Sequence, residues 1–334
     1  MSMNNNQKII AGITVLIIVA ISIWYFASPK EQIGTLETTK VKIGGLPITQ
    51  GLPLFLALEK GYFKEAGLDV EWVKFEAPNQ IVDALLAGQI DLSHTGGPMS
   101  IVAIADFKNP GKLKIFAAAG GDEIIANDSL MVKKDSNINS ILELEGKRLG
   151  ILAGIQWRTI AQHILAQNNL VADDDVALVE LAPSLQAQAL ASGQIDALLA
   201  IEPVPTIVKN QNIGREIVHT PTALYVSNPF YGGAGIIRAD FVTQNPRATK
   251  LVLDVFTRAV DEMNADLDAA RQYQRGYTPL EDNLISQVPI PKIKMYHGFS
   301  QDDVNAIQTF LDIFTVYEVV NGKINFQQIL YSPS

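Results

Sequence analysis

The sequence predicts an α/β fold of two lobes with a ligand cleft between them, preceded by one N-terminal transmembrane or signal helix. Three observations support this fold: a globular composition, a long apolar run near the N-terminus, and an internal repeat in which strands alternate with helices. The 334 residues are enough for about two domains of roughly 150 residues each. Hydrophobic residues make up 48% of the chain and charged residues 18%, a balance typical of packed globular proteins.

The residue counts also exclude several classes of function. Lys and Arg number 26 and Asp and Glu 35, so the net charge of −9 gives no general attraction to nucleic acid phosphates. Because the sequence contains no cysteine, it has no disulfide, zinc–thiolate site or thiol nucleophile. The four histidines lack metal-binding spacing, and no phosphate-binding or hydrolase motif occurs. We therefore expect no nucleic acid partner, no catalytic residue, no metal and no cofactor.

The first element is an apolar run at residues 9–27, which contains no charged side chain. As a helix it would be roughly 28 Å long, close to the thickness of a membrane core. For a signal peptide cleaved after Ala27, the bulky Tyr25 would occupy a position that requires a small residue. We therefore expect an uncleaved anchor within residues 1–30, with a cleaved signal peptide as the alternative. Lys8 and the α-amino group before the run predict an orientation with the rest of the chain outside the cytoplasm.

An internal repeat organises the elements that follow. The segment ALLAGQID at residues 84–91 matches ALASGQID at residues 189–196 in six of eight positions, 105 residues further along. Around each copy, the hydrophobic pattern predicts strand, helix, strand, helix and strand, hence parallel pairing within one α/β lobe per copy. The predicted elements lie at residues 40–44, 54–60, 70–75, 79–87 and 90–93 in the first copy, and at residues 148–152, 157–166, 177–181, 185–191 and 195–200 in the second.

The remaining chain is expected to return to the first lobe. Residues 222–226 and 231–238 predict strands, and long helical patterns follow at residues 246–267 and 301–315. The expected organisation is an anchor or signal segment at residues 1–30, a linker at 31–39, the first part of lobe 1 at 40–123, lobe 2 at 124–227, and the return to lobe 1 at 228–334.

Two such lobes create a cleft. In open α/β sheets, ligands bind beyond the carboxyl ends of the strands, where loops and helix N-termini converge. The repeat therefore predicts matching loops around one ligand, from the first lobe at residues 45–50, 95–98 and 119–122, and from the second lobe at residues 153–157 and 201–203.

Several segments, in this order, resemble the substrate-binding proteins of ABC importers of the nitrate, sulfonate and taurine type. They are LEKGYFKEAGLDVE at residues 58–71, LAGQIDL at 86–92 followed by TGGP, LEGKRLG at 144–150, and IEP at 201–203. The resemblance implies a type II periplasmic-binding fold, in a superfamily that also includes thiamine-pyrimidine-synthase-like domains. It also implies a monomer without catalytic activity that delivers a bound solute to a membrane permease and its ATPase.

The ligand-holding loops of that family and the predicted cleft give the residues expected at the ligand: Pro47, Gln50, Thr95, Gly96, Gly97, Gly121, Gln156, Trp157, Glu202 and Tyr231. The indole of Trp157 can stack on an organic ligand, with core packing as the alternative. Tyr231 and its neighbour Phe230 can form a second aromatic wall, again with core packing as the alternative. Glu202 is either paired within the hinge or hydrogen-bonded to a ligand N–H.

One departure from the family bears on the ligand. The segment GIQW at residues 154–157 stands where many relatives have Gly followed by Ser or Thr, whose amides and hydroxyls grip an anion. This departure favours an organic ligand with a flat or apolar body over a bare inorganic anion. His94, beside a predicted cleft loop, is expected to make a structural hydrogen bond rather than to contact the ligand.

We therefore expect an extracytoplasmic solute-binding protein, in the periplasm or held at the outer face of the cytoplasmic membrane by its N-terminal helix. Its ligand would be a small organic solute, either sulfonate- or taurine-like or a planar heterocycle, delivered to an ABC importer. Two alternatives stay open. One is a pyrimidine-precursor-synthase-like enzyme, whose family uses iron and a cysteine-rich motif that this chain lacks. The other is a membrane-tethered ligand sensor.

Overall fold

The computed structural model describes residue 4 and residues 38–333. The apolar run at residues 9–27, predicted to be a membrane anchor or signal, lies outside the described residues. Within the described residues, no helix combines the length and the apolar character needed to cross a membrane. The chain from Thr39 to Ser334 forms one compact unit, which contains both lobes.

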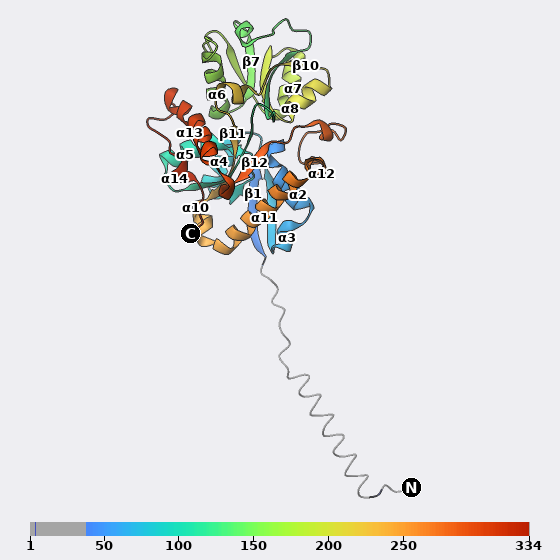
Figure 1. Ribbon diagram of the computed structural model, residues 1–334, viewed down its shortest axis with the longest axis vertical. Helices are drawn as coiled ribbons and strands as arrows, with labels where there is room; N and C mark the ends of the chain where they lie inside the picture. Colours follow the sequence, from blue (N-terminus) through green and yellow to red (C-terminus); the bar gives the residue numbers. More distant parts are fainter. Residues whose placement is uncertain (1–3, 5–37, 334) are drawn as a thin grey trace. The chain divides into compact units, whose positions relative to one another are not determined.

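Two β-sheets form the two lobes of this unit (Figure 1). Within the described residues, the first lobe has seven strands in the order β12-β5-β11-β3-β1-β2, with β4 paired to β11, and the second has five in the order β10-β6-β9-β7-β8. The first sheet consists of β1 (Thr39–Gly45), β2 (Leu68–Lys74), β3 (Leu92–Ser93), β4 (Gly97–Pro98), β5 (Leu113–Gly121), β11 (Phe230–Arg238) and β12 (Lys292–Met295). The second consists of β6 (Asp128–Lys133), β7 (Arg148–Leu152), β8 (Ala177–Leu181), β9 (Ala197–Ile201) and β10 (Gly214–His219).

Each sheet has a parallel core at the place that the repeat predicts. β1 pairs in parallel with β2 and β3, and β7 pairs in parallel with β8 and β9. Parallel neighbours require a crossover, which the helices between these strands provide. In β1, Val41 and Ile43 are fully buried, as expected for a strand covered on the face that they share. The predicted two-lobed α/β fold is confirmed for the described residues.

The chain passes between the lobes twice within the described residues, at 122–127 and at 220–229. The two connections lie side by side, because the side-chain amide of Asn228 donates to Glu123 Oε1 at 2.9 Å and Phe230 pairs with Gly121. Each connection delivers an antiparallel strand to the interior of the next sheet. β6 lies between β9 and β10, and β11 lies between β3 and β5.

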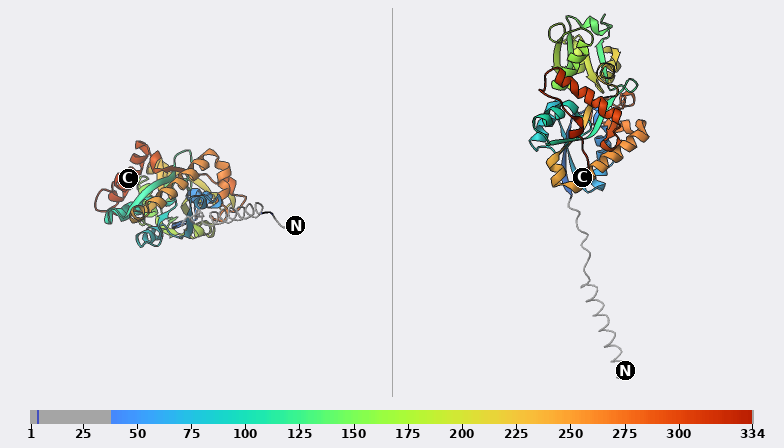
Figure 2. Two further views of the ribbon diagram at one scale, coloured as in Figure 1. Left: turned by 90° about the horizontal axis from the view of Figure 1, so that it is seen from below. Right: turned by 60° about the vertical axis from the view of Figure 1, so that its left-hand side comes forward.

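The helices cover the faces of the two sheets (Figures 1 and 2). α13 packs against α5 and β11 of the first lobe and against α6 of the second lobe, so it contacts both lobes. The first lobe carries α2 (Leu52–Glu59), α3 (Tyr62–Glu65), α4 (Pro78–Leu86), α5 (Met99–Lys108), α10 (Ala239–Gln244), α11 (Pro246–Ala265), α12 (Leu267–Arg271), α13 (Gln301–Val316) and α14 (Phe326–Ile329). The second lobe and its return connection carry α6 (Ile155–Ala166), α7 (Pro183–Ser192), α8 (Val204–Asn210) and α9 (Pro221–Tyr225).

The repeated AxxxGQID segment ends a helix in the same way in each lobe. Gly88 follows α4 with φ of 70°, and Gly193 follows α7 with φ of 76°. This left-handed conformation ends a helix at little cost only when the residue is glycine. After each glycine the chain turns directly into the strand that leads to the cleft. Local chemistry therefore positions the predicted cleft loops in both copies.

The core is continuous across the two lobes. A single cluster of buried hydrophobic residues includes Val132 and Ile151 from the second sheet together with Ile81 and Phe310 from the first lobe. Trp157 belongs to the same cluster, where the lobes meet. The lobes are therefore packed against one another rather than merely linked.

The prediction of a strand at residues 222–226 is wrong. The segment lies in α9, which begins with Pro221 at its first turn. Asp128, 94 residues earlier, accepts hydrogen bonds from the backbone N–H of Thr222 at 3.0 Å and from its hydroxyl at 2.6 Å. These bonds satisfy a donor that a helix start leaves free, and they come from the first residue of β6, directly after the other connection between the lobes. The local β propensity of the segment was overridden by a tertiary contact.

Candidate ligand site between the lobes

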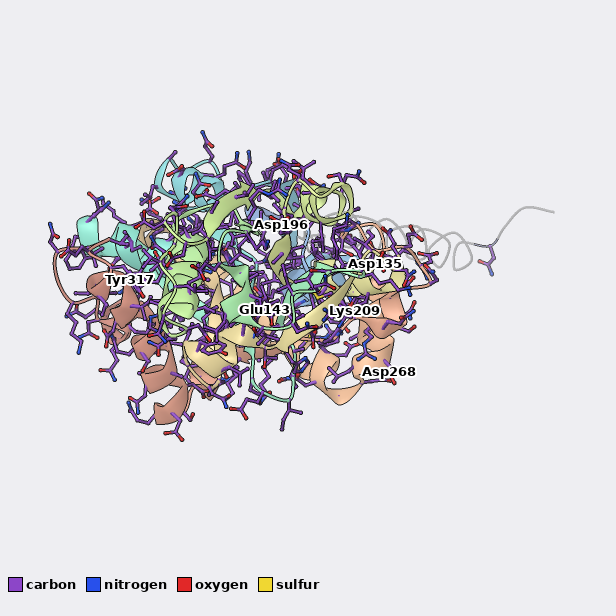
Figure 3. All side chains as sticks on the ribbon, turned by 90° about the horizontal axis from the view of Figure 1, so that it is seen from above. Asp135, Glu143, Asp196, Lys209, Asp268 and Tyr317 are labelled. Atoms are coloured by element: carbon purple, nitrogen blue, oxygen red, sulfur yellow. The ribbon has the colours of Figure 1, made fainter. Side chains whose placement is uncertain are left out.

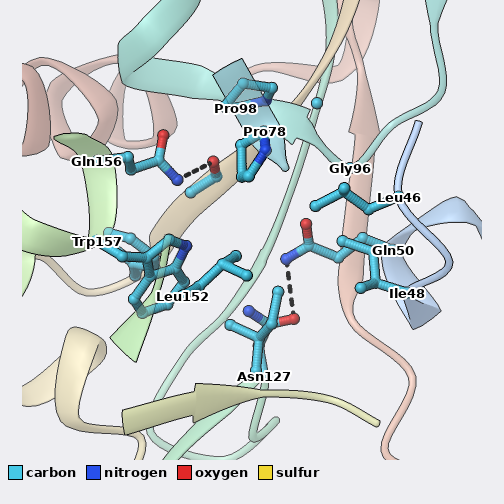
Figure 4. Close-up of a pocket in the computed structure, with 14 residues that line it drawn as sticks. Leu46, Ile48, Gln50, Pro78, Gly96, Pro98, Asn127, Leu152, Gln156 and Trp157 are labelled. Atoms are coloured by element: carbon cyan, nitrogen blue, oxygen red, sulfur yellow. Dashed lines mark hydrogen bonds between the residues drawn. The ribbon is translucent and has the colours of Figure 1, made fainter. Parts of the chain in front are cut away.

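A small cavity lies where the loops of the two lobes meet (Figure 4). The cavity has a volume of about 20 Å³, room for about one water molecule. Gln156 and Trp157 face Gln50 across it. Its walls come from Leu46, Ile48, Gln50, Pro78, Gly96, Gly97, Pro98, Asn127, Leu152, Gln156, Trp157, Ile201, Phe230 and Gly232.

The first-lobe wall is built by the loop that follows β1. Gln50 lies in a short 3₁₀ turn, Thr49–Gly51, directly before α2. Its side-chain Nε2 donates to Asn127 Oδ1 at 3.0 Å, and its backbone carbonyl accepts the hydroxyl of Thr95. Thr95 thereby joins the loop after β1 to the loop after β3. Both loops stand at the carboxyl ends of parallel strands, where ligands bind in open α/β sheets.

His94 connects the same two loops through hydrogen bonds of its ring. Its Nε2 donates to the carbonyl oxygen of Leu46 at 2.9 Å, and its Nδ1 accepts the backbone N–H of Gly96 at 2.8 Å. The ring stacks on Trp72 with centroids 5.5 Å apart. Burial without an ionic partner lowers the pKa of His94 to about 4, so the imidazole is neutral at pH 7. The expected structural hydrogen bond is present, and both of its partners are residues that line the cavity.

The second-lobe wall is the first turn of α6. Gly154 precedes this helix with φ of 111°, a backbone conformation that residues other than glycine rarely adopt. The turn directs Gln156 and Trp157 into the cavity, and both are nearly buried, at 3% and 4% exposure. Gln156 Oε1 accepts from the N–H and the hydroxyl of Ser100, while its Nε2 donates to the Gly232 carbonyl. Gln156 therefore joins the lobes directly.

The third wall comes from the connections between the lobes. Asn127 lies in the first connection and Phe230 and Gly232 follow the second. Asn127 is buried, and no hydrogen-bond partner reaches its Nδ2 among the described residues. Its own backbone carbonyl accepts the N–H of Glu202 at 2.9 Å, which fixes the start of the connection against the second lobe.

Five of the ten predicted site residues line this cavity, and two more lie just behind it. Pro47 is buried between the lining residues Leu46 and Ile48, and Thr95 is buried behind the Gln50 loop. The five that line the cavity are Gln50, Gly96, Gly97, Gln156 and Trp157.

Glu202 and Tyr231 lie beside the cavity but point away from it. Their neighbours Ile201 and Phe230 line the cavity instead. Tyr231 and Phe230 are successive residues of β11 and face opposite sides, whereas Glu202 lies just beyond the end of β9. Glu202 Oε2 accepts the Thr206 N–H at the start of α8, and burial raises the pKa of Glu202 to about 7.

Tyr231 instead donates its hydroxyl to Asp303 Oδ1 at 2.8 Å. Burial opposes ionisation of Asp303, but hydrogen bonds from Lys294 and Ser300 lower the pKa of Asp303 to about 2. This buried network fixes the strand whose other face lines the cavity.

Gly121 supports the cavity without lining it. It pairs with Phe230, and a Cβ added to it would lie 2.3 Å from the carbonyl oxygen of Ile125. The lack of a side chain therefore lets the first connection turn away from β5. The individual lining residues that the sequence did not single out include Pro78, Asn127 and Leu152. Asn127 lies close to the predicted lobe boundary between residues 123 and 124, and a polar residue there was the signal that could have found it.

Two other hollows are each lined by one lobe alone, and a third lies between α8 and residues 287–289. One hollow of the second lobe is lined by Asp135, Glu143 and Asp196, which are labelled in Figure 3 in a view onto that lobe. Lys133 and Lys147 line the same hollow, so its walls carry charges of both signs. The interlobe cavity differs in that its lining consists of apolar side chains, glycines, prolines and three carboxamides. Such walls suit a small, largely uncharged molecule with a few directed hydrogen bonds.

Comparison with known sequences agrees with this geometry. A nitrate/nitrite binding protein, NrtA from Nostoc, is 28% identical over 232 residues, which cover 65% of this chain and 52% of that protein. This chain thus spans about half the length of that relative. A 4-amino-5-hydroxymethyl-2-methylpyrimidine phosphate synthase, THI13 from Saccharomyces cerevisiae, is 22% identical over 268 residues, 78% of this chain and 76% of that protein.

Solved structures share the fold at low sequence identity. The alkanesulfonate-binding protein SsuA from Xanthomonas axonopodis pv. citri, bound to MOPS, matches with a TM-score of 0.72 at 18% identity, over 88% of this chain and 99% of that chain. The ligand binding component of an ABC-type import system from Staphylococcus aureus matches with a TM-score of 0.69 at 15% identity, over 88% of this chain and 97% of that chain. The predicted resemblance is confirmed. Because residues 34–275 match the NMT1-like family, this chain belongs to that family.

Proposed function

We propose that this protein is an extracytoplasmic solute-binding protein, which captures a small organic solute between its lobes and delivers it to an ABC importer. The observation that carries the proposal is the interlobe cavity, where loops at equivalent positions of two repeated α/β units meet. Relatives with this fold include binding proteins for nitrate or nitrite and for alkanesulfonates. Binding between lobes is therefore the function that the geometry supports best.

The composition of the walls supports an organic solute over a bare anion. Trp157 and Phe230 offer aromatic surface to a flat body, whose burial is favourable. Gln50, Asn127 and Gln156 add carboxamides that can direct a few hydrogen bonds. Among the described residues, no lining side chain carries a charge, so a bare anion would depend on backbone amides.

Entry of such a solute requires the lobes to separate. The cavity has room for about one water, whereas a drug-sized or metabolite-sized ligand needs a pocket of roughly 300 Å³ or more. The connections at residues 122–127 and 220–229 are where the lobes can rotate. A solute that contacts both lobes binds the closed arrangement better than the open one, so it shifts the population toward closure.

The same proposal includes partners and location. One fold neighbour is the ligand binding component of an ABC-type import system, which supports a permease and its ATPase as partners of this chain. The apolar run at residues 9–27 would hold a monomeric protein at the outer face of the cytoplasmic membrane. One relative is a pyrimidine phosphate synthase, but the carboxamide and apolar walls support binding more directly than proton transfer, which needs a titratable group in reach.

Lobe closure can be measured on the full chain by energy transfer. Because the sequence has no cysteine, substitutions at two exposed positions, Lys64→Cys in the first lobe and Asp174→Cys in the second, give one specific label pair. A matched control pair, Lys64→Cys with Lys108→Cys, lies within the first lobe. Sulfonates, taurine, nitrate and neutral heterocycles are then added while melting temperature and energy transfer are recorded.

We expect one solute class to raise the melting temperature and to change energy transfer only for the interlobe pair. At a free solute concentration of a hundred times Kd, binding stabilises the folded chain by about 2.7 kcal/mol. Small molecules released by heating the freshly purified chain are identified by mass spectrometry as an independent arm. If no solute changes either signal and no stoichiometric molecule is released, the proposed function is wrong.

A further inference from the structure

The side chain of Gln156 makes three hydrogen bonds across the boundary between the lobes. Its Oε1 accepts from the backbone N–H and from the hydroxyl of Ser100, each at 3.0 Å. Its Nε2 donates to the carbonyl oxygen of Gly232 at 2.9 Å. Gln156 belongs to α6 of the second lobe, whereas Ser100 on α5 and Gly232 on β11 belong to the first. One carboxamide therefore links the two halves of the cleft.

The partners of this carboxamide form a subsite with a defined hydrogen-bond pattern. Ser100 is fully buried in the first turn of α5, where backbone N–H groups have no partner within the helix. It offers two donors, and Gly232 offers one acceptor. A carbonyl oxygen next to an N–H satisfies all three. A carboxylate, sulfonate or nitrate has only acceptors, so one of its oxygens would face the Gly232 carbonyl oxygen without a hydrogen.

A separate donor faces the same cavity. Asn127 is 97% buried, since its exposed fraction is 3%, and it lines the cavity from the first connection. Its Oδ1 accepts from Gln50, but no group among the described residues accepts a hydrogen bond from its Nδ2. An unpaired buried amide donor is unfavourable, so an acceptor atom on a solute would gain by reaching it. Asn127 and the Ser100 subsite therefore supply two points of polar recognition.

We propose that the solute carries an amide-type edge, a carbonyl oxygen beside an N–H, which replaces the Gln156 carboxamide between Ser100 and Gly232. A second acceptor on the solute then takes the free donor of Asn127. This inference rests on the proposed solute-binding function and names its ligand class: an uncharged amide, lactam or cyclic ureide. Gln156 acts as an internal competitor, because its side chain leaves the subsite before the solute enters.

Chemical rescue tests the subsite without knowledge of the natural solute. In the full chain, Gln156→Ala leaves Ser100 and Gly232 without their partner, and we expect a melting temperature lower by roughly 3–6 °C. Acetamide carries the same head group and should restore most of that loss. Acetate and N,N-dimethylacetamide should not, because acetate lacks a donor and the dimethyl compound lacks an N–H.

Gln308→Ala is the matched control. Gln308 also makes three hydrogen bonds, to Asp312, to the Ile324 carbonyl and to the Phe326 N–H, but it is half-buried and lies outside the cavity lining. Water can replace its carboxamide, so acetamide should leave the melting temperature of this variant unchanged. Equal recovery in both variants, recovery by acetate, or no recovery of Gln156→Ala would each overturn the inference.

Direct binding separates this inference from the proposed function. The wild-type full chain is titrated with 2-pyrrolidone, hydantoin and uracil, with 1,3-dimethyluracil as the analogue without N–H, and with taurine, methanesulfonate and nitrate. We expect a rise in melting temperature of at least about 2 °C with an amide-edge compound and none with the dimethyl analogue. Binding of taurine, methanesulfonate or nitrate alone would refute the amide edge and leave solute binding intact. Failure of every solute, with no molecule released on heating, would count against both.

Discussion

His94 should make the protein lose stability as the pH falls below 7. Its imidazole is fully buried, with Leu46 and Gly96 as hydrogen-bond partners and Trp72 stacked on the ring. Burial lowers the pKa of His94 from 6.5 to about 4 because the imidazolium would lose its hydration without gaining a counter-ion. The neutral ring therefore holds the two first-lobe loops of the cavity together.

The magnitude follows from that difference in pKa. Because the folded-state pKa of His94 lies below that of the unfolded chain, the unfolded chain takes up the proton first. The stability that His94 contributes is therefore complete above pH 6.5 and is lost as the pH falls toward 4. The loss amounts to about 2 kcal/mol between pH 7 and pH 5, and to about 3 kcal/mol by pH 3.

Urea unfolding of the full chain at pH 7, 6 and 5 measures this loss, with His94→Gln as the reference. Glutamine keeps one donor and one acceptor but does not titrate, so the stability of the variant should change less with pH than that of the wild type. Burial raises the pKa values of Asp128 and Glu202 to about 6 and about 7, so these two groups add stability as the pH falls. They do so equally in the wild type and in His94→Gln, so their contributions cancel when the two proteins are compared. An identical pH dependence of the two proteins would refute the reasoning.

Three further outcomes are expected. Glu202→Gln should raise the free energy of unfolding by up to about 3 kcal/mol at pH 8 and by little at pH 4.5, because the cost of ionising buried Glu202 appears only as the pH rises through about 7. Urea titrations at both pH values test this, and an equal gain at both would contradict it. Trp157→Ala should weaken solute binding by roughly 1–3 kcal/mol in calorimetry, because the indole lines the cavity. The same change should cost about 3–5 kcal/mol of stability, because the indole also packs in the core shared by both lobes. Unchanged affinity would assign Trp157 to packing alone. Gly121→Ala should lower the free energy of unfolding in urea by about 1–3 kcal/mol, since its Cβ would lie 2.3 Å from the Ile125 carbonyl oxygen. If the variant is as stable as the wild type, the connection can shift to accommodate the methyl group.

The elements that local sequence specifies were predictable. β7 and β8 have the expected bounds, Arg148–Leu152 and Ala177–Leu181. The run in β7 is buried from Leu149 onward, as is characteristic of an interior parallel strand, whereas β8 is the half-exposed edge strand beside it. The ends of α4 and α7 follow from Gly88 and Gly193, whose positive φ needs glycine. The helix α9 was not predictable, because Asp128, distant in sequence, supplies the hydrogen bonds at its start.

The candidate site was predictable to the level of loops but not of single side chains. Glu202 and Tyr231 each stand one residue from a lining residue. Strand alternation turns Tyr231 to the opposite face of β11, and Glu202, just beyond β9, instead accepts the N–H of Thr206. Which face of β11 meets the cavity depends on the register of β11 within its sheet, and nothing local encodes that register. Asn127 stayed hidden because its role comes from the meeting of both lobes at the connection.

The two connections between the lobes enter their sheets through interior strands, which ladder hydrogen bonds hold on both sides. β6 is fixed between β9 and β10, and β11 between β3 and β5. Because the two connections lie side by side and cannot slide within their sheets, we expect them to favour rotation of the lobes about a shared hinge over twisting. Opening would then explore a narrow range of lobe orientations. Under the proposed function, closing on a solute would therefore cost less orientational entropy than it would through a single flexible tether.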